Sequence, residues 1–293
     1  MNNKLATGLL LSMGSLLVSH QALASSAWVG TADYMQAPTA TGDEASVGPF
    51  DTYDFGPGIG LVKPDTTVAA GNTFTGYFQT VVTSHMLNGT AINVGQLDVS
   101  AGNNFSGTGN GFELTVRSSF TGTYVNVPST PFGSLDVNIT GGTASLYFDT
   151  SPDYSFANDS GFADAAPILT GTITGGFGTV FAPALVGAGF ETIDLDLTGS
   201  FGSFDADVYS PDTIAGGTAL FALKVKNAFN QTPIINQVTG GLNKVAGATA
   251  VGGQLFEMDG QLQLTAVPLP GSAWLFLSAM MGLISFNRKN RSV

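Results

Sequence analysis

The sequence predicts an all-β, antiparallel fold, in the form of a β-sandwich or a jelly-roll-like pair of layers. Apolar and polar residues alternate in several short segments, which is the pattern of half-buried strands. Glycine is frequent, at 39 of 293 residues, and Gly, Asn, Asp and Thr fill the stretches between these segments. No segment between residues 25 and 266 keeps the 3.6-residue apolar period of an amphipathic helix.

The first strands are expected in the N-terminal half of the chain. Residues 25–57 are small, polar and acidic with three prolines, which predicts an irregular lead-in with a single strand. Residues 73–82 alternate and predict a strand. Residues 111–116 and 120–127 predict a pair of strands that turn at residues 117–119.

The clearest local pattern predicts a β-hairpin in residues 134–149. Residues 134–140 alternate strictly, and residues 143–149 alternate again. Gly141 and Gly142 between them can both take the positive φ of a two-residue turn. Such a turn sets six apolar side chains on one face: Leu135, Val137, Ile139, Ala144, Leu146 and Phe148.

The C-terminal half adds one long loop, three strands, and a Gly- and Thr-rich stretch at residues 168–180 with some strand character. Residues 151–166 are polar and acidic, and we predict a functional loop there because of their length. Alternation predicts strands at 191–198, 219–225 and 254–266, with Gly260 at a turn or bulge. An outer-membrane barrel also has alternating strands, but the apolar C-terminal segment with its basic end argues against that architecture.

Charge and cysteine content exclude several classes of function. The chain has no cysteine, so it has neither a disulfide framework nor a thiolate metal site. All 21 acidic residues lie between Asp33 and Asp259, with five of the nine basic ones, which leaves this part about 16 net negative charges. Nucleic-acid binding needs a basic surface, so we expect no nucleic-acid partner. An acidic surface attracts divalent cations instead.

The N-terminus has the three parts of a secretory signal peptide, which we predict over residues 1–24. Lys4 supplies the positive charge and residues 5–18 form the apolar region. Ala22-Leu23-Ala24 provides the small-residue cleavage site. The exported β-rich part is therefore expected to cover residues 25–266.

The tail, residues 267–293, combines three features in a fixed order. Pro268-Leu269-Pro270 comes first, and proline cannot continue a helix backwards. The uncharged apolar run that follows is shorter than the roughly 20 residues of a comfortable membrane span. A basic cluster of Arg288, Lys289 and Arg291 comes last, and such cations favour the cytoplasmic side. This order predicts a transmembrane helix that anchors the protein only temporarily.

The tail resembles the PEP-CTERM sorting signal, a bacterial C-terminal motif that the membrane protease exosortase reads. Leu269 stands where glutamate is commonest, so the tail is similar to the Val-Pro-Leu-Pro variant. The resemblance implies export, anchoring in the inner membrane, cleavage near Pro268–Pro270, and release to the surface of a bacterium that makes exopolysaccharide. Residues 142–149 also resemble flocculation-associated members, which implies a structural or adhesive role in biofilm or floc formation.

We expect a non-enzymatic protein. His85 is the one histidine after the predicted signal peptide, and no nucleophile-elbow, zinc-protease, phosphate-binding or dinucleotide-binding motif accompanies it. A glycosidase needs only two suitably separated carboxylates. A polysaccharide-acting enzyme therefore stays open as an alternative, with its candidate acids at Asp149, Asp153, Asp194 and Asp196. A carbohydrate-binding module is the other alternative, with Tyr124, Tyr147 and Tyr154 as candidate platforms.

Calcium is the one cofactor that the sequence suggests. It takes roughly six to eight hard oxygen ligands, from carboxylates, amides and backbone carbonyls, often in loops. Asp149, Asp153, Asp159 and Asp164 lie in or beside the acidic loop and form the predicted site, without the spacing of an EF-hand. The expected partners are exosortase, the membrane before processing, and exopolysaccharide or other matrix components.

Overall fold

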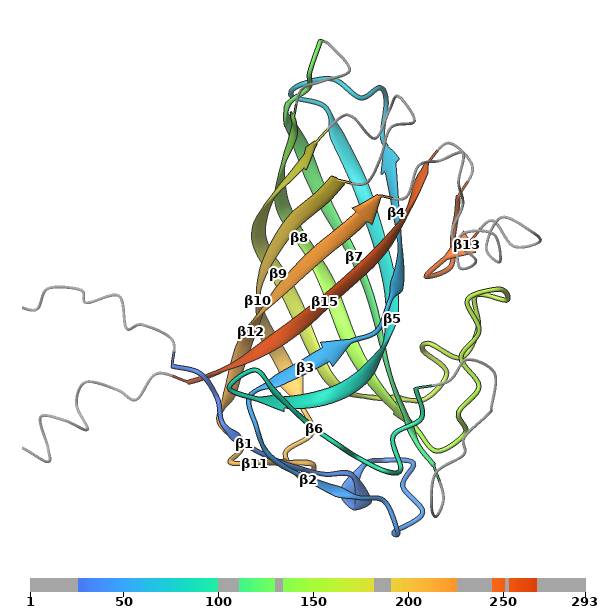
Figure 1. Ribbon diagram of the computed structural model, residues 1–293, viewed down its shortest axis with the longest axis vertical. Coiled ribbons are helices and arrows are strands. Elements are labelled where there is room, and N and C mark those ends of the chain that lie inside the picture. Colours follow the sequence, from blue (N-terminus) through green and yellow to red (C-terminus); the bar gives the residue numbers. More distant parts are fainter. Residues whose placement is uncertain are drawn as a thin grey trace, which may run out of the picture. The chain divides into compact units, whose positions relative to one another are not determined.

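The computed structural model describes residues 26–99, 111–129, 134–181, 191–225, 244–250 and 253–267 (Figure 1). Ala27–Val267 form one compact unit. The predicted signal peptide and all of the predicted sorting signal except Val267 lie outside the described residues. Within the described ranges, no helix has both the length and the apolar character to cross a membrane.

The main sheet is antiparallel and contains ten strands. They are β3 (Thr52–Phe55), β4 (Gly58–Pro64), β5 (Thr73–Leu87), β6 (Thr90–Ile92), β7 (Glu113–Asn126), β8 (Ser134–Asp149), β9 (Ala166–Phe181), β10 (Glu191–Phe204), β12 (Ile214–Val225) and β15 (Gln254–Ala266). The all-β, antiparallel class that the sequence predicts is confirmed. The strands predicted at 73–82, 191–198, 219–225 and 254–266 all lie within observed ones.

The main sheet closes on itself. In the series β5, β7, β8, β9, β10 and β12, each strand pairs with the next one in the series. β12 also pairs with β15, and β15 pairs with β3 and β4, which both pair with β5. The described strands thus form a meander, without the crossed connections of a jelly roll. Opposed walls of strands enclose one core, and the hydrogen bonding is continuous from one wall to the other (Figure 1).

A three-stranded sheet packs at one end of the main sheet (Figure 1). It consists of β11 (Tyr209–Ser210), β1 (Gly30–Asp33) and β2 (Ser46–Phe50), and a 3₁₀ turn, η1 (Tyr34–Gln36), follows β1. The predicted irregular lead-in was therefore wrong in its strand content, since β1, β2 and β3 all precede residue 57. The strands are only four or five residues long, too short for alternation to be visible in the sequence.

Alternate side chains of the long strands fill the core with large apolar groups. The buried set includes Phe74, Phe78, Leu114, Phe120, Ile139, Leu146, Phe148 and Ile168. The small sheet adds Val47 and Phe50, and Trp28 comes from the segment before β1. Each such side chain contributes about 1.5–3 kcal/mol relative to an exposed position. The Trp28 indole also donates a hydrogen bond to the Pro211 carbonyl at 2.9 Å.

Residues 134–149 do not form the predicted hairpin. They form the single strand β8, 16 residues long, which pairs with both β7 and β9. Gly122 of β7 pairs with Ile139 and Thr121 with Gly141, so β8 has one extra residue between these pairs. This bulge shifts the alternation by one. Val137, Ile139, Leu146 and Phe148 are consequently all buried, which confirms the shared apolar face but not the turn.

Two further turn predictions were also wrong. Residues 117–119 lie inside β7, which runs unbroken from Glu113 to Asn126. Gly260 lies in regular pairing with Phe221, and the irregularity next to it falls on the partner side, between β3 and β4. In both places polar or small residues continue a long strand, with Ser118 on its buried face, and a single sequence cannot distinguish that from a turn.

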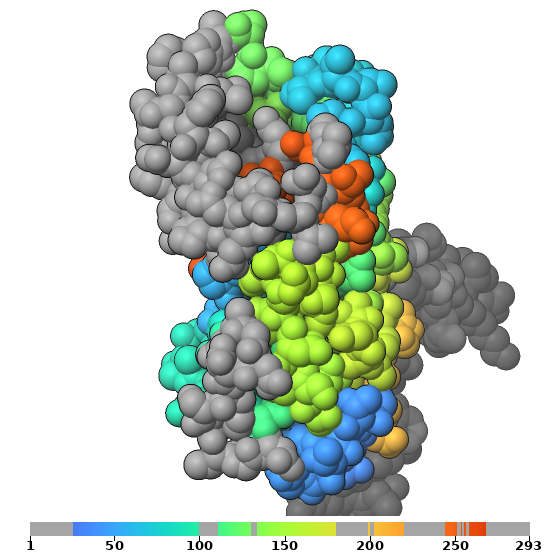
Figure 2. All heavy atoms as spheres, turned by 90° about the vertical axis from the view of Figure 1, so that its right-hand side faces the viewer, coloured from blue at the N-terminus to red at the C-terminus, as the bar shows by residue number. Residues whose placement is uncertain are grey.

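Part of the outer face of the main sheet is covered by two irregular segments. One is the loop between β8 and β9, and the other is the hairpin of β13 (Lys244–Val245) and β14 (Ala248–Thr249). They lie next to each other on one face of the molecule (Figure 2), and the Gly247 amide donates to Asp159 at 2.9 Å. They bury a second apolar cluster over β4 and β5: Ile59, Leu61, Val81, Tyr154, Phe156, Phe162 and Val245.

Candidate functional site

Three carboxylates meet where the β8–β9 loop leaves the main sheet. Glu113 is the first residue of β7 and Asp149 the last of β8, and the two are directly paired across the strands. Asp153 comes from the loop that follows. One carboxylate oxygen from each residue lies within 4.8 Å of the other two, and we call these three residues the acidic cluster. Like charges opposite each other on neighbouring strands are destabilising, so the arrangement needs a compensating interaction.

The loop holds the acidic cluster in place through backbone contacts. The Tyr154 amide donates to Glu113 Oε2 at 3.3 Å, and the Ser151 amide donates to Asp149 Oδ1 at 2.8 Å. Thr115, two residues along β7, donates its hydroxyl to the Phe162 carbonyl at 3.1 Å. The loop therefore lies across the outer face of β7 and encloses Glu113.

Glu113 is fully buried, with 0% of its surface exposed, and its Oε1 atom has no hydrogen-bond partner. Burial, followed by the charges of Asp149 and Asp153, raises the pKa of Glu113 to about 8. Burial and then Asp164 raise the pKa of Asp149 and of Asp153. Among the described residues, the charges that raise these pKa values are all negative, and this is the environment that favours either a shared proton or a bound cation.

The structure brings together only part of the predicted calcium site. Asp149 and Asp153 meet in the acidic cluster, and Asp164 is close enough to affect the pKa of both. Asp159 points elsewhere, since its carboxylate accepts the Gly247 amide of the β13–β14 hairpin. Glu113 was not predicted, because it alternates with Phe112 and Leu114 like any outward residue of a strand. No local signal shows that a loop 40 residues later covers it.

A polar network separate from the acidic cluster lies inside the core. His85, expected as a loop or strand-end residue, is fully buried, and its Nε2 lies 2.6 Å from the Tyr34 hydroxyl. Tyr34, Tyr53 and Tyr209 continue a chain of hydroxyl contacts, at 3.2 and 2.8 Å. Burial lowers the pKa of His85 to about 3 and raises the pKa of all three tyrosines. The network therefore stays neutral near pH 7 and serves to join the small sheet to the main one.

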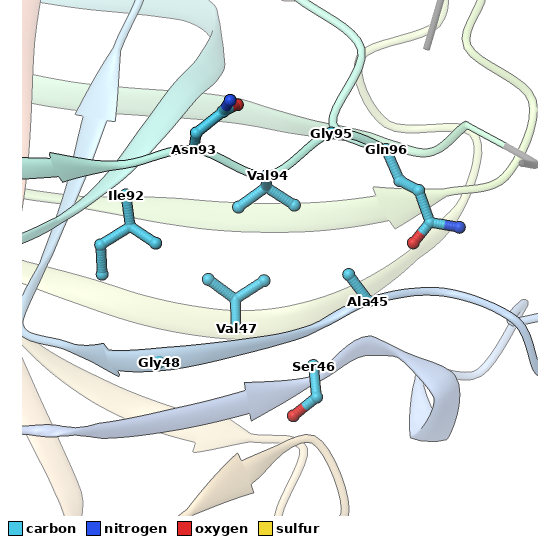
Figure 3. Close-up of a pocket in the computed structure, with 9 residues that line it drawn as sticks. All are labelled: Ala45, Ser46, Val47, Gly48, Ile92, Asn93, Val94, Gly95 and Gln96. Atoms are coloured by element: carbon cyan, nitrogen blue, oxygen red, sulfur yellow. The ribbon is translucent and has the colours of Figure 1, made fainter. Parts of the chain in front are cut away.

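A groove of about 560 Å³ lies between β2 and the segment after β6. Val47, Ile92 and Val94 point into the space between the two segments, and Ser46 and Asn93 point away from it (Figure 3). None of the nine lining residues is an acid or a base. The groove therefore offers apolar contact and amide groups, without a group that could transfer a proton.

Two of the three tyrosines considered as sugar platforms are closed to solvent. Tyr124 and Tyr154 are buried at 3% exposure each, and Tyr147 is half-buried. The Tyr154 hydroxyl donates to the Val99 carbonyl and its ring packs against Phe156 and Phe162. Stacking against a sugar ring needs an exposed aromatic face, which Tyr124 and Tyr154 lack.

The residues that the sequence assigns to processing cannot be placed in the fold. Ala22, Ala24, Pro268, Leu269, Pro270, Arg288, Lys289 and Arg291 all lie outside the described residues.

The fold and site together define an all-β domain with a closed antiparallel meander, a buried hydroxyl–imidazole network and an acidic cluster on its outer wall. Comparison with known proteins adds no family to this description: no family model, no curated protein and no solved structure matches the chain.

Proposed function

We propose that this protein is an exported, non-catalytic cell-surface or matrix protein with a structural or adhesive role in biofilm or floc formation. It is anchored in the inner membrane by its tail, processed by exosortase near Pro268–Pro270, and then released to the cell surface or the extracellular matrix. There its sandwich-like body associates with exopolysaccharide or other matrix components. The resemblance of residues 267–293 to a PEP-CTERM signal is the origin of this proposal.

The observation that supports it best is where the folded body begins and ends. The compact unit covers Ala27–Val267, which nearly matches the segment between the two predicted export signals. Its two ends are tied together, since the Trp28 amide donates to the Leu264 carbonyl at 3.0 Å. The Val267 amide, the last described one, donates to the Thr213 carbonyl at 2.8 Å. Cleavage just before and just after this unit leaves its core intact.

The closed main sheet also suits a protein that persists outside the cell. An open sheet has edge strands whose unpaired N–H and C=O groups promote aggregation. Here the seam between β12 and β15 pairs ten residues of β12 in register, from Ile214 to Lys224 with one irregularity. The net negative charge keeps such a domain soluble and leaves matrix contacts to its surface.

Mass spectrometry of the protein recovered from the surface of cells that contain exosortase tests the processing step. We expect an N-terminus near Ser25 and a C-terminus near Pro268–Pro270. Replacing Arg288, Lys289 and Arg291 together with glutamine should reduce processing, because the basic end orients the tail. The control is Lys244→Gln, which removes an exposed positive charge from the folded body and should be processed normally. Recovery of a mature form that still ends at Val293, or of the protein in the cytosol, contradicts the proposal.

Truncation provides a separate prediction about the body itself. A chain of residues 25–267 should melt within about 2 °C of the full chain, since 1 kcal/mol corresponds to roughly 2–4 °C at this size. A chain that ends at Leu262 should lose at least about 3 kcal/mol, because it lacks the fully buried Leu264 and its bonds to Trp28 and Asp51. Thermal unfolding followed by circular dichroism measures both. Equal melting temperatures for the two truncated chains would show that the fold does not need the β15 end.

A further inference from the structure

The acidic cluster has features of a ligand site that extend beyond its charge. Glu113 is completely buried, yet its Oε1 has no partner, while its other oxygen is already bonded to the Tyr154 amide. Leaving a buried carboxylate oxygen unsatisfied is unfavourable, so proteins rarely keep one without a hydrogen-bond donor, a water or an ion beside it. Asp149 likewise uses one oxygen for the Ser151 amide. A cation that binds several carboxylate oxygens at once would satisfy the site.

The spacing and the donor set fit a hard cation. Two oxygens that each lie about 2.4 Å from one ion are at most about 4.8 Å apart. The three carboxylates offer one oxygen each within that limit. Zinc prefers nitrogen and sulfur ligands, but the chain has no cysteine and His85 lies in the core. Magnesium usually keeps most of its waters and shares a phosphate ligand. Asp153 is exposed, so water can complete the shell on the open side.

We propose that Glu113, Asp149 and Asp153 form a calcium site, with Asp164 adding negative charge beside it, and that the bound ion fastens the β8–β9 loop to the outer wall of the main sheet. Asp153 precedes Tyr154, whose ring belongs to the second apolar cluster with Phe156 and Phe162. An ion held by both the strands and the loop therefore stabilises the packing of that cluster over β4 and β5. This set differs from the one predicted from sequence by including Glu113 and excluding Asp159.

Thermal unfolding of the full chain, first in chelator and then with calcium chloride, tests the proposal. At a calcium concentration about 100-fold above its Kd, we expect the melting temperature to rise by about 5 °C or more. Isothermal titration calorimetry should give a stoichiometry of one. Glu113→Gln keeps the shape of the side chain and the bond to Tyr154, and should weaken calcium binding by about tenfold or more. Magnesium chloride at the same concentration should produce a clearly smaller shift.

Asp159→Asn provides the matched control. It removes one negative charge from the same loop, and its amide oxygen can still accept the Gly247 amide. Calcium should bind this variant as it binds the native chain. Near-ultraviolet circular dichroism establishes that each variant is folded.

Three results would overturn the proposal. One is the absence of both a binding heat and a shift in melting temperature up to about 10 mM calcium, which exceeds the dissociation constants of extracellular calcium modules. The carboxylates would then share protons and bind no ion. Another is an unchanged calcium response in folded Glu113→Gln. The third is loss of binding in Asp159→Asn with retention in Glu113→Gln, which places the ion elsewhere in the loop.

Discussion

Replacing His85 with glutamine should remove most of the imidazole's contribution to acid unfolding of this protein. The native chain should lose about 3 kcal/mol more stability than His85→Gln between pH 6.5 and about pH 4. In the folded protein His85 has a pKa of about 3, against 6.5 for a free imidazole, because burial disfavours the charged ring. A charged imidazole carries a proton on both ring nitrogens, and Nδ1 has no partner that could accept one.

The direction of this pH dependence follows from the linkage between protonation and folding. Above pH 6.5 the imidazole is neutral in both the folded and the unfolded chain, and its contribution to stability is fully present. As the pH falls from 6.5 towards 3, the unfolded chain takes up a proton that the folded chain excludes, and stability is lost. The groups that face His85 are Tyr34, Tyr53 and Phe50, and burial keeps the tyrosines neutral throughout this range. His85 is the one histidine of the predicted mature chain, so no other imidazole contributes.

Urea unfolding at a series of pH values, in chelator, measures the effect. The glutamine amide has both a donor and an acceptor for the Tyr34 hydroxyl, so His85→Gln should fold, with a moderate loss near pH 7 of about 1–2 kcal/mol. Tyr53→Phe serves as the control, since it removes a hydroxyl of the same network and leaves the imidazole. The free energy of unfolding of Tyr53→Phe should be lower than that of the native chain by a similar amount at every pH. A native and a His85→Gln profile of equal slope below pH 6.5 would contradict this explanation.

Alanine at Gly142 should destabilise the protein by about 3 kcal/mol, while alanine at Gly141 should change stability by less than about 0.5 kcal/mol. In β8 a Cβ atom at Gly142 would overlap the backbone of β7, with the Phe120 Cα at 2.7 Å. A Cβ atom at Gly141 finds its nearest neighbour, the Ile173 carbonyl oxygen, at 3.8 Å. Neither glycine has a positive φ, so space alone distinguishes the two positions.

Denaturant unfolding of the two variants distinguishes the continuous strand from a hairpin. In a two-residue turn both glycines would need positive φ, and alanine would be strained at either position by a comparable amount. Nearly equal losses in Gly141→Ala and Gly142→Ala would therefore contradict the bulged strand. A large loss confined to Gly142→Ala would agree with it.

Local pattern was sufficient to predict which residues face the core. Val137, Ile139, Leu146 and Phe148 were expected on one face, and all are buried, because the preference of apolar side chains for the interior acts at each position. The length of the strands was not predictable in this way. Glycine pairs and polar triplets such as Arg117-Ser118-Ser119 fit a turn and a continuous stretch of a long strand equally well, and the neighbouring strands decide between them.

The candidate site was likewise predictable only in part from the local sequence. Its Asp149 and Asp153 are close in the chain, and sequence alone grouped them as possible ligands. Glu113 joins them through the pairing of β7 with β8, and it loses its solvent because the loop closes over it. Exposure and electrostatic environment depend on residues that are distant in sequence, so neither was available from the local pattern.

The sequence by itself determined the all-β class, the positions of most long strands and the excess of negative charge over residues 25–266, because these follow from residue type and local alternation. Only the tertiary structure decided that the sheet closes through β12 and β15, that His85 is a core residue, and that Glu113 meets Asp149 and Asp153. Those outcomes depend on hydrogen bonding and burial between segments far apart in the chain, and no local pattern of residues encodes them.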